Sequence, residues 1–171
     1  MLRVSLSEAH AGAVETTGEI APDDPLLAGA EWPLARPLRV RGRFSSAGEG
    51  KFFWRAHGET ALSAECRRCL AGVEVPLSLD LSLVFAVGTD TPEGEGCYLI
   101  QARSQELDLG PALREELLLA TPRYVECRPD CKGLCPRCGA NLNEGPCDCR
   151  AESDPRWGAL RQLTQTDSRK D

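Results

Sequence analysis

The segment from Cys127 to Cys149 holds six of the nine cysteines in this 171-residue sequence, and clustered thiolates are typical ligands of zinc. Besides cysteine, its only sizeable apolar side chains are Leu134 and Leu142, so it cannot bury a core of its own. Ordering its backbone costs roughly 1–2 kcal/mol per residue. A thiolate-bound structural zinc contributes about 10–16 kcal/mol in small peptides near neutral pH. The segment therefore predicts one zinc ion with a structural role.

The firmest pair of ligands is Cys135 and Cys138, which are separated by two residues and followed by Gly139. This spacing brings both sulfurs to one point, and glycine permits the positive φ that turns backbone amides toward them. Two more ligands must come from the other four cysteines of the segment, and spacing alone does not decide among them. The preferred quartet is Cys131, Cys135, Cys138 and Cys149, with Cys127 and Cys147 in reserve.

Two other chemistries for these thiols compete with zinc. A disulfide knot needs an oxidising compartment, whereas residues 1–8 show no apolar region of a secretory signal peptide. An iron–sulfur cluster also accepts four thiolates, but the tight turn at Cys135 suits a tetrahedral ion and no cluster-type spacing occurs. Because no open-site donor accompanies the cysteines, the zinc is expected to be structural rather than catalytic.

A second pair, Cys66 and Cys69, encloses Arg67 and Arg68 far upstream of the cysteine-rich segment. It could supply half of a metal site that the spare downstream cysteines complete. It could also act as a redox dithiol, because the two arginines favour thiolates. The third alternative is that the two cysteines have no joint role, since the residue after Cys69 is not glycine and no thioredoxin-like pattern surrounds them.

Hydrophobic periodicity predicts the elements that position these residues. The apolar alternation at every odd position from Val73 to Val87 is the clearest strand signal, and strands are also expected at residues 2–6, 37–44, 51–66 and 98–100. Residues 8–36 are expected to be loop. A helix near residues 109–120 follows Asp108, and a shorter terminal helix should begin at Asp154, with Trp157, Leu160 and Leu163 as its apolar stripe.

These elements indicate an α+β fold in which an antiparallel β-meander is packed by a helix. A cysteine-rich, zinc-binding segment and a short terminal helix complete the chain. Residues 1–124 are expected to form the sheet-and-helix core domain, and residues 125–171 the zinc-stapled unit.

Basic residues alternate along the two central strands of the expected meander. They are Arg39, Arg41 and Arg43 on the first strand and Lys51 and Arg55 on the second. Such a stripe could contact an RNA backbone, and Phe52 or Trp54 beside it could stack on unpaired bases. The alternative is an ordinary solvated strand face above a core that contains those aromatic residues.

Composition limits the classes of function. The net charge of −6 argues against a basic footprint over the whole protein, and no stretch has the length of a membrane span. A cytoplasmic protein without a membrane or small-molecule partner is the expectation. Only His10 and His57 occur, and the spacing gives neither a nucleophile nor a carboxylate partner, so enzymatic activity is not expected.

The cysteine-rich segment, with the residues that follow it, resembles the YceD family. The resemblance rests on Cys131-Lys132-Gly133-Leu134-Cys135-Pro136-x-Cys138-Gly139-x-Asn141-Leu142-Asn143, on Cys147-x-Cys149, on Asp154-Pro155-Arg156-Trp157 with Leu160 and Leu163, and on Cys66-Arg67-Arg68-Cys69-Leu70. It covers most of the chain from about Leu38 onward. Members of this family are implicated in the accumulation of large-subunit ribosomal RNA in bacteria and plastids.

The resemblance implies a non-enzymatic ribosome-biogenesis factor needed for accumulation of large-subunit (23S) ribosomal RNA. Its expected partner is that RNA or a pre-ribosomal particle. Two alternatives stay open, namely a thiol redox protein that uses Cys66 and Cys69, and a protein-interaction module.

Overall fold

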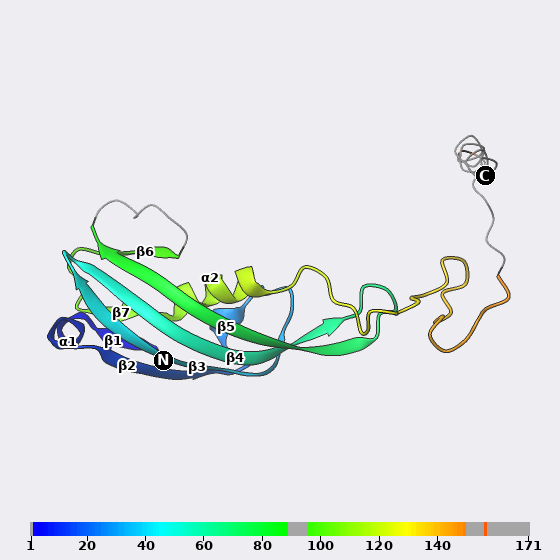
Figure 1. The fold of residues 1–171 in the computed structure, drawn as a ribbon, viewed down its shortest axis with the longest axis horizontal. Helices are drawn as coiled ribbons and strands as arrows, with labels where there is room; N and C mark the ends of the chain where they lie inside the picture. Colours follow the sequence, from blue (N-terminus) through cyan, green and yellow to red (C-terminus); the bar gives the residue numbers. More distant parts are fainter. Residues whose placement is uncertain (1, 89–95, 150–155, 157–171) are drawn as a thin grey trace, which may run out of the picture.

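The computed structural model describes residues 2–88, residues 96–149 and Arg156. Its main element is a five-stranded sheet with the strand order β2-β3-β4-β5-β6 (Figure 1). The strands are β2 (Val14–Ile20), β3 (Leu34–Gly48), β4 (Lys51–Glu65), β5 (Gly72–Val87) and β6 (Cys97–Ile100). A small second sheet pairs β1 (Arg3–Ser5) with β7 (Glu106–Asp108). Within the described residues the fold is thus mainly β, with few helices.

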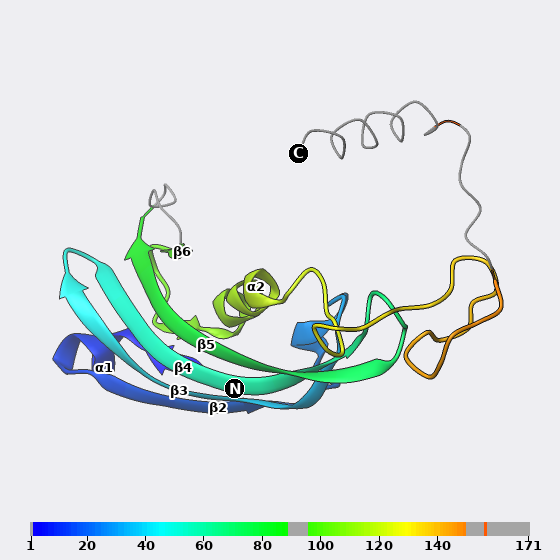
Figure 2. The ribbon, with the colours of Figure 1, turned by 45° about the vertical axis from the view of Figure 1, so that its right-hand side comes forward.

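In the part of the chain that the structure describes, three short helical elements accompany the sheets. They are α1 (Leu6–Ala11), the 3-10 turn η1 (Pro25–Leu27) and α2 (Gly110–Ala120). Figure 2 shows α2 lying over the concave side of the curved main sheet. Its buried side chains, Ala112, Leu113 and Leu117, join the inward-facing residues of the strands in one hydrophobic core. The helix begins where the Asp108 carboxylate accepts a hydrogen bond from the backbone N–H of Gly110 at 2.9 Å.

The alternation expected from the sequence decides which strand residues face the core. Leu79, Leu81, Leu83 and Phe85 of β5 are buried, and the even-numbered residues between Ser78 and Ser82 are exposed. On β4 the inward positions are the even ones, so Phe52 and Trp54 are fully buried. Phe52 and Trp54 therefore cannot stack on RNA bases, because side chains of alternate residues point to opposite faces of a strand.

Residues 8–36 are not the loop that their composition suggests, because they contain most of α1, all of β2 and η1, and the start of β3. The strand pattern of β2 is hidden by two inward positions that are not hydrophobic. Thr16 is buried because its hydroxyl accepts a hydrogen bond at 2.9 Å from the indole N–H of Trp54. Gly18 leaves room for Leu2, whose side chain would lie 2.8 Å from a Cβ at that position.

The main sheet is also mixed rather than purely antiparallel. Strands β2 to β5 pair antiparallel, as expected for a meander, but β6 pairs parallel with β5 from Val84 opposite Cys97 to Val87 opposite Ile100. Tyr98 and its neighbours were expected to form a strand, and they do. Periodicity indicates that a strand forms but carries no information on its direction, so the parallel pairing could not be read from the sequence.

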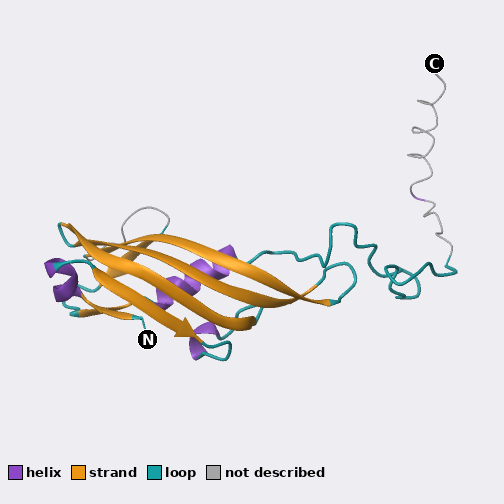
Figure 3. Cartoon of the chain, turned by 60° about the horizontal axis from the view of Figure 1, so that its bottom comes forward, coloured by secondary structure: helices purple, strands orange, loops and turns teal. Residues whose placement is uncertain are grey.

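After α2 the chain runs as loops and turns past the end of the β4–β5 hairpin (Figure 3). The expected terminal helix at Asp154 lies outside the described residues. Within the described part of the chain, no helix is long and apolar enough to span a membrane.

Candidate metal centres and nucleic-acid interface

Eight of the nine cysteines form two groups of four. Within each group all sulfur atoms lie within 4.8 Å of one another. The group that we call the inner cluster contains Cys66, Cys69, Cys127 and Cys131. The group that we call the outer cluster contains Cys135, Cys138, Cys147 and Cys149. Both groups offer the four thiolates of a closed structural metal site.

The inner cluster joins the turn between β4 and β5 to the chain that follows α2. Figure 2 shows these two segments side by side, with the outer part of the cysteine-rich segment beyond them. Backbone hydrogen bonds hold the junction, from the N–H of Arg67 to the carbonyl of Val125 at 2.9 Å and from the N–H of Leu134 to the carbonyl of Arg68 at 3.0 Å. Val73 and Leu134 pack against the buried cysteines of this cluster. The inner cluster therefore fastens the cysteine-rich segment to the sheet.

The sulfur separations fit a tetrahedral metal ion. Cys66 Sγ lies 3.8 Å from Cys131 Sγ, and Cys69 Sγ lies 3.7 Å from Cys127 Sγ. Four sulfurs at the usual zinc–sulfur distance of about 2.3 Å lie roughly 3.8 Å apart in a regular tetrahedron. Disulfide sulfurs would be about 2.05 Å apart, and all nine cysteines are free thiols. The donor set and its spacing thus match a thiophilic divalent ion.

Electrostatics within each cluster also favour a cation. The backbone N–H of Cys127 is the leading cause that lowers the pKa of Cys66 to about 6. Backbone N–H groups of Cys138 and Arg137 likewise lower the pKa of Cys135 to about 6. The neighbouring sulfur of Cys138 raises the pKa of Cys149 to about 12. Adjacent thiolates repel one another, so all four sulfurs of a cluster ionise together only around a positive ion.

The two Cys-x2-Cys turns have the same backbone structure. The N–H of the residue after the second cysteine donates to the carbonyl of the first, from Leu70 to Cys66 at 2.8 Å and from Gly139 to Cys135 at 2.9 Å. The first cysteine of each turn donates its own N–H to an alanine five residues later, at 2.8 Å in both turns. The residue after the second cysteine has a positive φ in both turns. Leu70 therefore adopts the left-handed backbone conformation that a glycine, such as Gly139, adopts without strain.

We expect Leu70→Gly to stabilise the protein by about 0.5–1 kcal/mol. A left-handed backbone costs an ordinary residue roughly 1–2 kcal/mol, and the greater freedom of glycine in the unfolded chain offsets part of that gain. Leu70 is 59% exposed, so its removal sacrifices little packing. Denaturant unfolding of the metal-loaded protein measures the change.

Gly139→Leu provides the matched reverse substitution. A Cβ at Gly139 would meet no atom within 4 Å, so backbone strain alone should destabilise that turn. Loss of stability in Leu70→Gly would contradict the equivalence of the two turns.

The grouping of the sulfurs differs from the quartet expected from spacing. Cys135, Cys138 and Cys149 do lie together, but Cys147 is their fourth neighbour, and Cys131 lies with Cys127, Cys66 and Cys69. Cys147 and Cys149 both approach one point because the backbone between them is not extended. The upstream pair thus meets one of the spare cysteines, Cys127, and one member of the preferred quartet, Cys131, whereas the other spare, Cys147, joins the outer cluster. A usable signal was the shared pattern Cys-x-Arg-Cys-x-Ala at residues 66–71 and 135–140.

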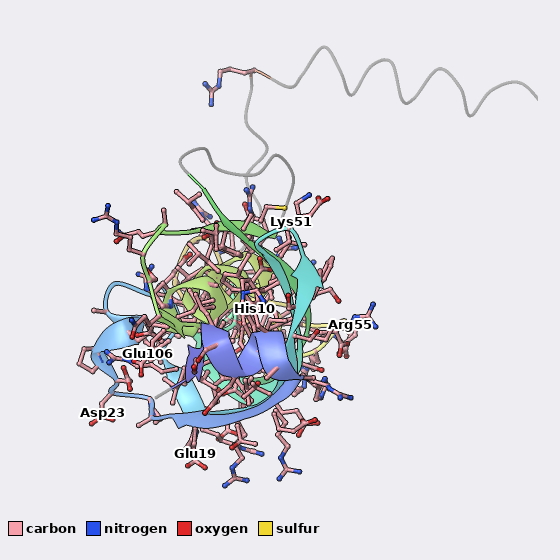
Figure 4. All side chains as sticks on the ribbon, turned by 90° about the vertical axis from the view of Figure 1, so that its left-hand side faces the viewer. His10, Glu19, Asp23, Lys51, Arg55 and Glu106 are labelled. Carbon is pink, nitrogen blue, oxygen red and sulfur yellow. The ribbon has the colours of Figure 1, made fainter. Side chains whose placement is uncertain are left out.

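The five basic residues selected from the sequence lie together on the outer face of the main sheet. Register places Arg43 directly opposite Arg55, and Arg41 opposite His57. Figure 4 shows Arg55 and Lys51 projecting outward from β4. The aromatic residue on this face is Phe53, which is 44% exposed and pairs with Ser45. The residue available for stacking on a base is therefore Phe53, and not Phe52 or Trp54 as expected from the sequence.

Acidic residues neutralise part of this face. Arg39 pairs with Glu19 at 3.3 Å, and Arg43 pairs with Glu15 at 3.8 Å. His57 contacts the carboxylate of Asp80 at 2.8 Å, and hydrogen bonds to Asp80 and then Glu59 raise the pKa of the histidine.

Arg41, Lys51 and Arg55 form no ion pair with any described residue. These three cations, with Arg43 and Phe53, make up what we call the basic face.

Comparison with the sequences of known proteins places the chain in a family. The sequence pattern of the family described as "Large ribosomal RNA subunit accumulation protein YceD" matches residues 54–164. An uncharacterized protein of Mycobacterium tuberculosis is 34% identical over 109 residues, which cover 61% of this chain and 51% of that protein. The Arabidopsis thaliana protein named "Large ribosomal RNA subunit accumulation protein YCED homolog 1, chloroplastic" is 33% identical over 107 residues, which cover 54% of this chain and 33% of that protein.

The uncharacterized protein YlbN of Bacillus subtilis is 28% identical over 137 residues, which cover 77% of this chain and 76% of that protein. This chain spans about half the length of the mycobacterial relative. No solved structure is a significant match. The matched residues begin at Trp54 and include the rest of β4, all of β5 and α2, and all eight clustered cysteines. Because the match covers well over half of the sequence, the chain belongs to the YceD family of large ribosomal RNA subunit accumulation proteins.

Proposed function

We propose that this protein is a non-enzymatic ribosome-biogenesis factor that supports accumulation of 23S ribosomal RNA by binding that RNA or a pre-ribosomal particle. The basic face is the proposed contact surface. Family membership and the name of the Arabidopsis relative support the link to large-subunit ribosomal RNA. The proposal assigns the recognition of the RNA to the sheet and a structural role to the cysteine clusters.

The observation that carries the proposed contact surface is the register that places Arg43 directly opposite Arg55, with only Arg43, among the described residues, in an ion pair, to Glu15 at 3.8 Å. Like charges directly opposite each other on neighbouring strands destabilise a sheet. Arg41 lies on the same face two residues from Arg43, and it adds to the repulsion. A phosphate backbone would relieve it, because each phosphate neutralises one cation and releases a condensed counterion.

Phe53 gives the basic face a second mode of RNA contact. Its ring is 44% exposed and lies on β4 between Lys51 and Arg55, on the same face. Aromatic side chains on sheet surfaces stack on unpaired bases, and each stacked base contributes about 1–3 kcal/mol. Because the basic face offers cations that can bind phosphates beside a ring that can stack on a base, it should bind single-stranded or looped RNA best.

For the cysteine clusters we propose two structural zinc ions, one in each. Zinc suits four thiolates at tetrahedral spacing, and a closed shell of four protein ligands leaves no position for a substrate. The inner ion would hold the cysteine-rich segment against the β4–β5 turn. The outer ion would close the segment on itself. A redox role for Cys66 and Cys69 is less well supported, because both sulfurs lie among four rather than as an isolated pair.

Crosslinking in living cells tests the proposed function. We expect the tagged protein to recover fragments of 23S ribosomal RNA, or of its precursor, well above an untagged control. Recovery should fall several-fold when Arg41 and Arg55 are both changed to glutamine, while the protein level stays unchanged. Recovery of neither ribosomal RNA nor ribosomal proteins above background would reject the proposal. Partners that survive nuclease treatment would indicate a protein-interaction module instead.

A further inference from the structure

The side-chain amide of Asn143 connects the two cysteine clusters. Asn143 lies in the chain between Cys138 and Cys147, inside the loop that the outer cluster closes. Its Nδ2 donates a hydrogen bond to the sulfur of Cys131 in the inner cluster, at 3.4 Å. A residue positioned by one set of four sulfurs thus contacts a ligand atom of the other set.

Every hydrogen-bonding position of this amide is occupied. Nδ2 also donates to the side-chain oxygen of Asn141 at 2.8 Å. Oδ1 accepts from the backbone N–H of Lys132 at 2.8 Å and from the guanidinium of Arg128 at 2.9 Å. Exchanging O and N would set two acceptors against each other at Asn141 and two donors at Lys132. The network therefore fixes the orientation in which an N–H points at the sulfur.

The outer loop itself supplies the support for Asn143. The Asn141 side chain accepts from the backbone N–H of Asn143 at 3.1 Å and donates to Glu144 at 2.9 Å. Leu142 donates its backbone N–H to the carbonyl of Gly133 at 2.9 Å, between the two clusters. These contacts persist only while residues 139–146 keep their fold, and that loop has little apolar surface of its own.

We propose that the two clusters bind their metal ions cooperatively and that Asn143 is the positioning residue that couples them. Metal in the outer cluster orders the loop and places the Asn143 N–H on Cys131 Sγ. That hydrogen bond stabilises the thiolate and its orientation as a ligand. By reciprocity, metal in the inner cluster then favours the ordered outer loop. The inference rests on the proposed metal binding, and it adds an interaction between the sites.

The expected loss of metal affinity can be estimated from other metalloproteins. Hydrogen-bond partners of metal ligands typically change metal affinity by about 10–100-fold. Asn143→Ala should therefore weaken the inner site by about 10–100-fold, although Asn143 is not itself a ligand.

Cobalt(II) is a suitable probe because thiolate-to-cobalt absorption reports each bound ion. The full chain is loaded with two equivalents of Co²⁺ and challenged with a chelator of known affinity. A variant that carries both Cys138→Ser and Cys149→Ser has lost two outer ligands, so it identifies the signal of the inner site. The inner affinity should fall by a similar factor in Asn143→Ala and in this outer-site variant. Combining the changes should produce no further loss, because both remove the same contact.

Two further variants separate coupling from general damage. Asn143→Asp keeps oxygen acceptors for Lys132 and Arg128 but has no N–H for the sulfur, so it should also weaken the inner site and shift its cobalt spectrum. Glu144→Gln lies on the same loop, keeps an acceptor for Asn141, and should leave the inner site unchanged.

An inner affinity within about twofold of wild type in Asn143→Ala, or additive losses in the combined variant, would overturn the coupling while leaving both metal sites intact. A wild-type chain that binds no metal would instead reject the metal sites themselves.

Discussion

Removing metal from the protein should unfold residues 122–149 while the main sheet stays folded. The sheet and α2 have their own hydrophobic core, which contains none of the eight clustered cysteines. Apart from the cysteines, residues 122–149 bury few apolar side chains, chiefly Val125 with Leu134 and Leu142 half-buried, and Val73 of β5 packs against the inner cluster. A structural zinc contributes about 10–16 kcal/mol near neutral pH, so its loss exceeds anything that those few apolar contacts could offset.

Limited proteolysis measures this effect at defined peptide bonds. Trypsin should cut after Lys132 and Arg137 in the chelator-treated protein and spare both bonds in the metal-loaded protein, with rates differing by roughly 100-fold or more. The β-sheet signal in circular dichroism should change little. Metal analysis of gently purified protein should give about two equivalents of zinc, falling to one in Cys66→Ser or in Cys138→Ser.

The ninth cysteine supplies the matched control for these substitutions. Cys97 lies on β6 and belongs to neither cluster, so Cys97→Ser should retain both ions and the resistance to trypsin. Less than about half an equivalent of zinc in the wild type, or equal trypsin sensitivity with and without chelator, would contradict the prediction.

The local spacing of the cysteines predicted each tight Cys-x2-Cys turn, but not which other two cysteines lie beside each turn. Cys135 and Cys138 were identified because two residues and a glycine fix a turn without help from the rest of the chain. Cys131 and Cys66 are 65 residues apart, and only the folded β4–β5 hairpin and the chain after α2 bring them together. Ligand sets that join distant segments depend on the fold, so a preferred quartet drawn from one segment differed from the observed grouping.

The same distinction between local and tertiary information applies to the strands. The alternation of β5 is visible because its inward residues are all apolar, from Val73 to Phe85. The pattern of β2 is not visible, because its inward positions include Thr16, which is buried with a hydrogen bond to Trp54, and the half-buried Gly18, which leaves room for Leu2. A buried polar residue is recognised only when its partner is known. The exposed ring of Phe53, by contrast, follows from the alternation of β4 alone, because residues 51, 53 and 55 share one face.

Changing both Arg41 and Arg55 to glutamine should make RNA binding less sensitive to salt. The slope of log K against log salt concentration should become shallower by about 1.4–1.8. Each neutralised phosphate contributes roughly 0.7–0.9 to that slope, and two cations would be lost. Neither arginine has an ion-pair partner among the described residues, so the substitutions strand no carboxylate. Both are exposed on the sheet, so the stability of the protein should change by less than about 0.5 kcal/mol.

Titration of purified protein against a looped RNA and a fully paired RNA, at several salt concentrations, provides the measurement. Arg36→Gln is the matched control, because Arg36 lies on the same strand but its guanidinium is held by Glu74 at 2.8 Å. It should leave the slope unchanged. Phe53→Ala should weaken binding of the looped RNA by about 1–3 kcal/mol and bind the paired RNA as before, since only unpaired bases can stack on the ring.

The net charge of −6 sharpens this test. A protein of that charge repels RNA at long range, so binding must come from a local group of cations, and removing two of them should weaken it. If the double variant retained the wild-type slope, the RNA contact would have to lie elsewhere on the protein. The repulsion between Arg43 and Arg55 would then be offset only in part, by Glu15 beside Arg43, and substituting Arg55 by threonine should stabilise the protein.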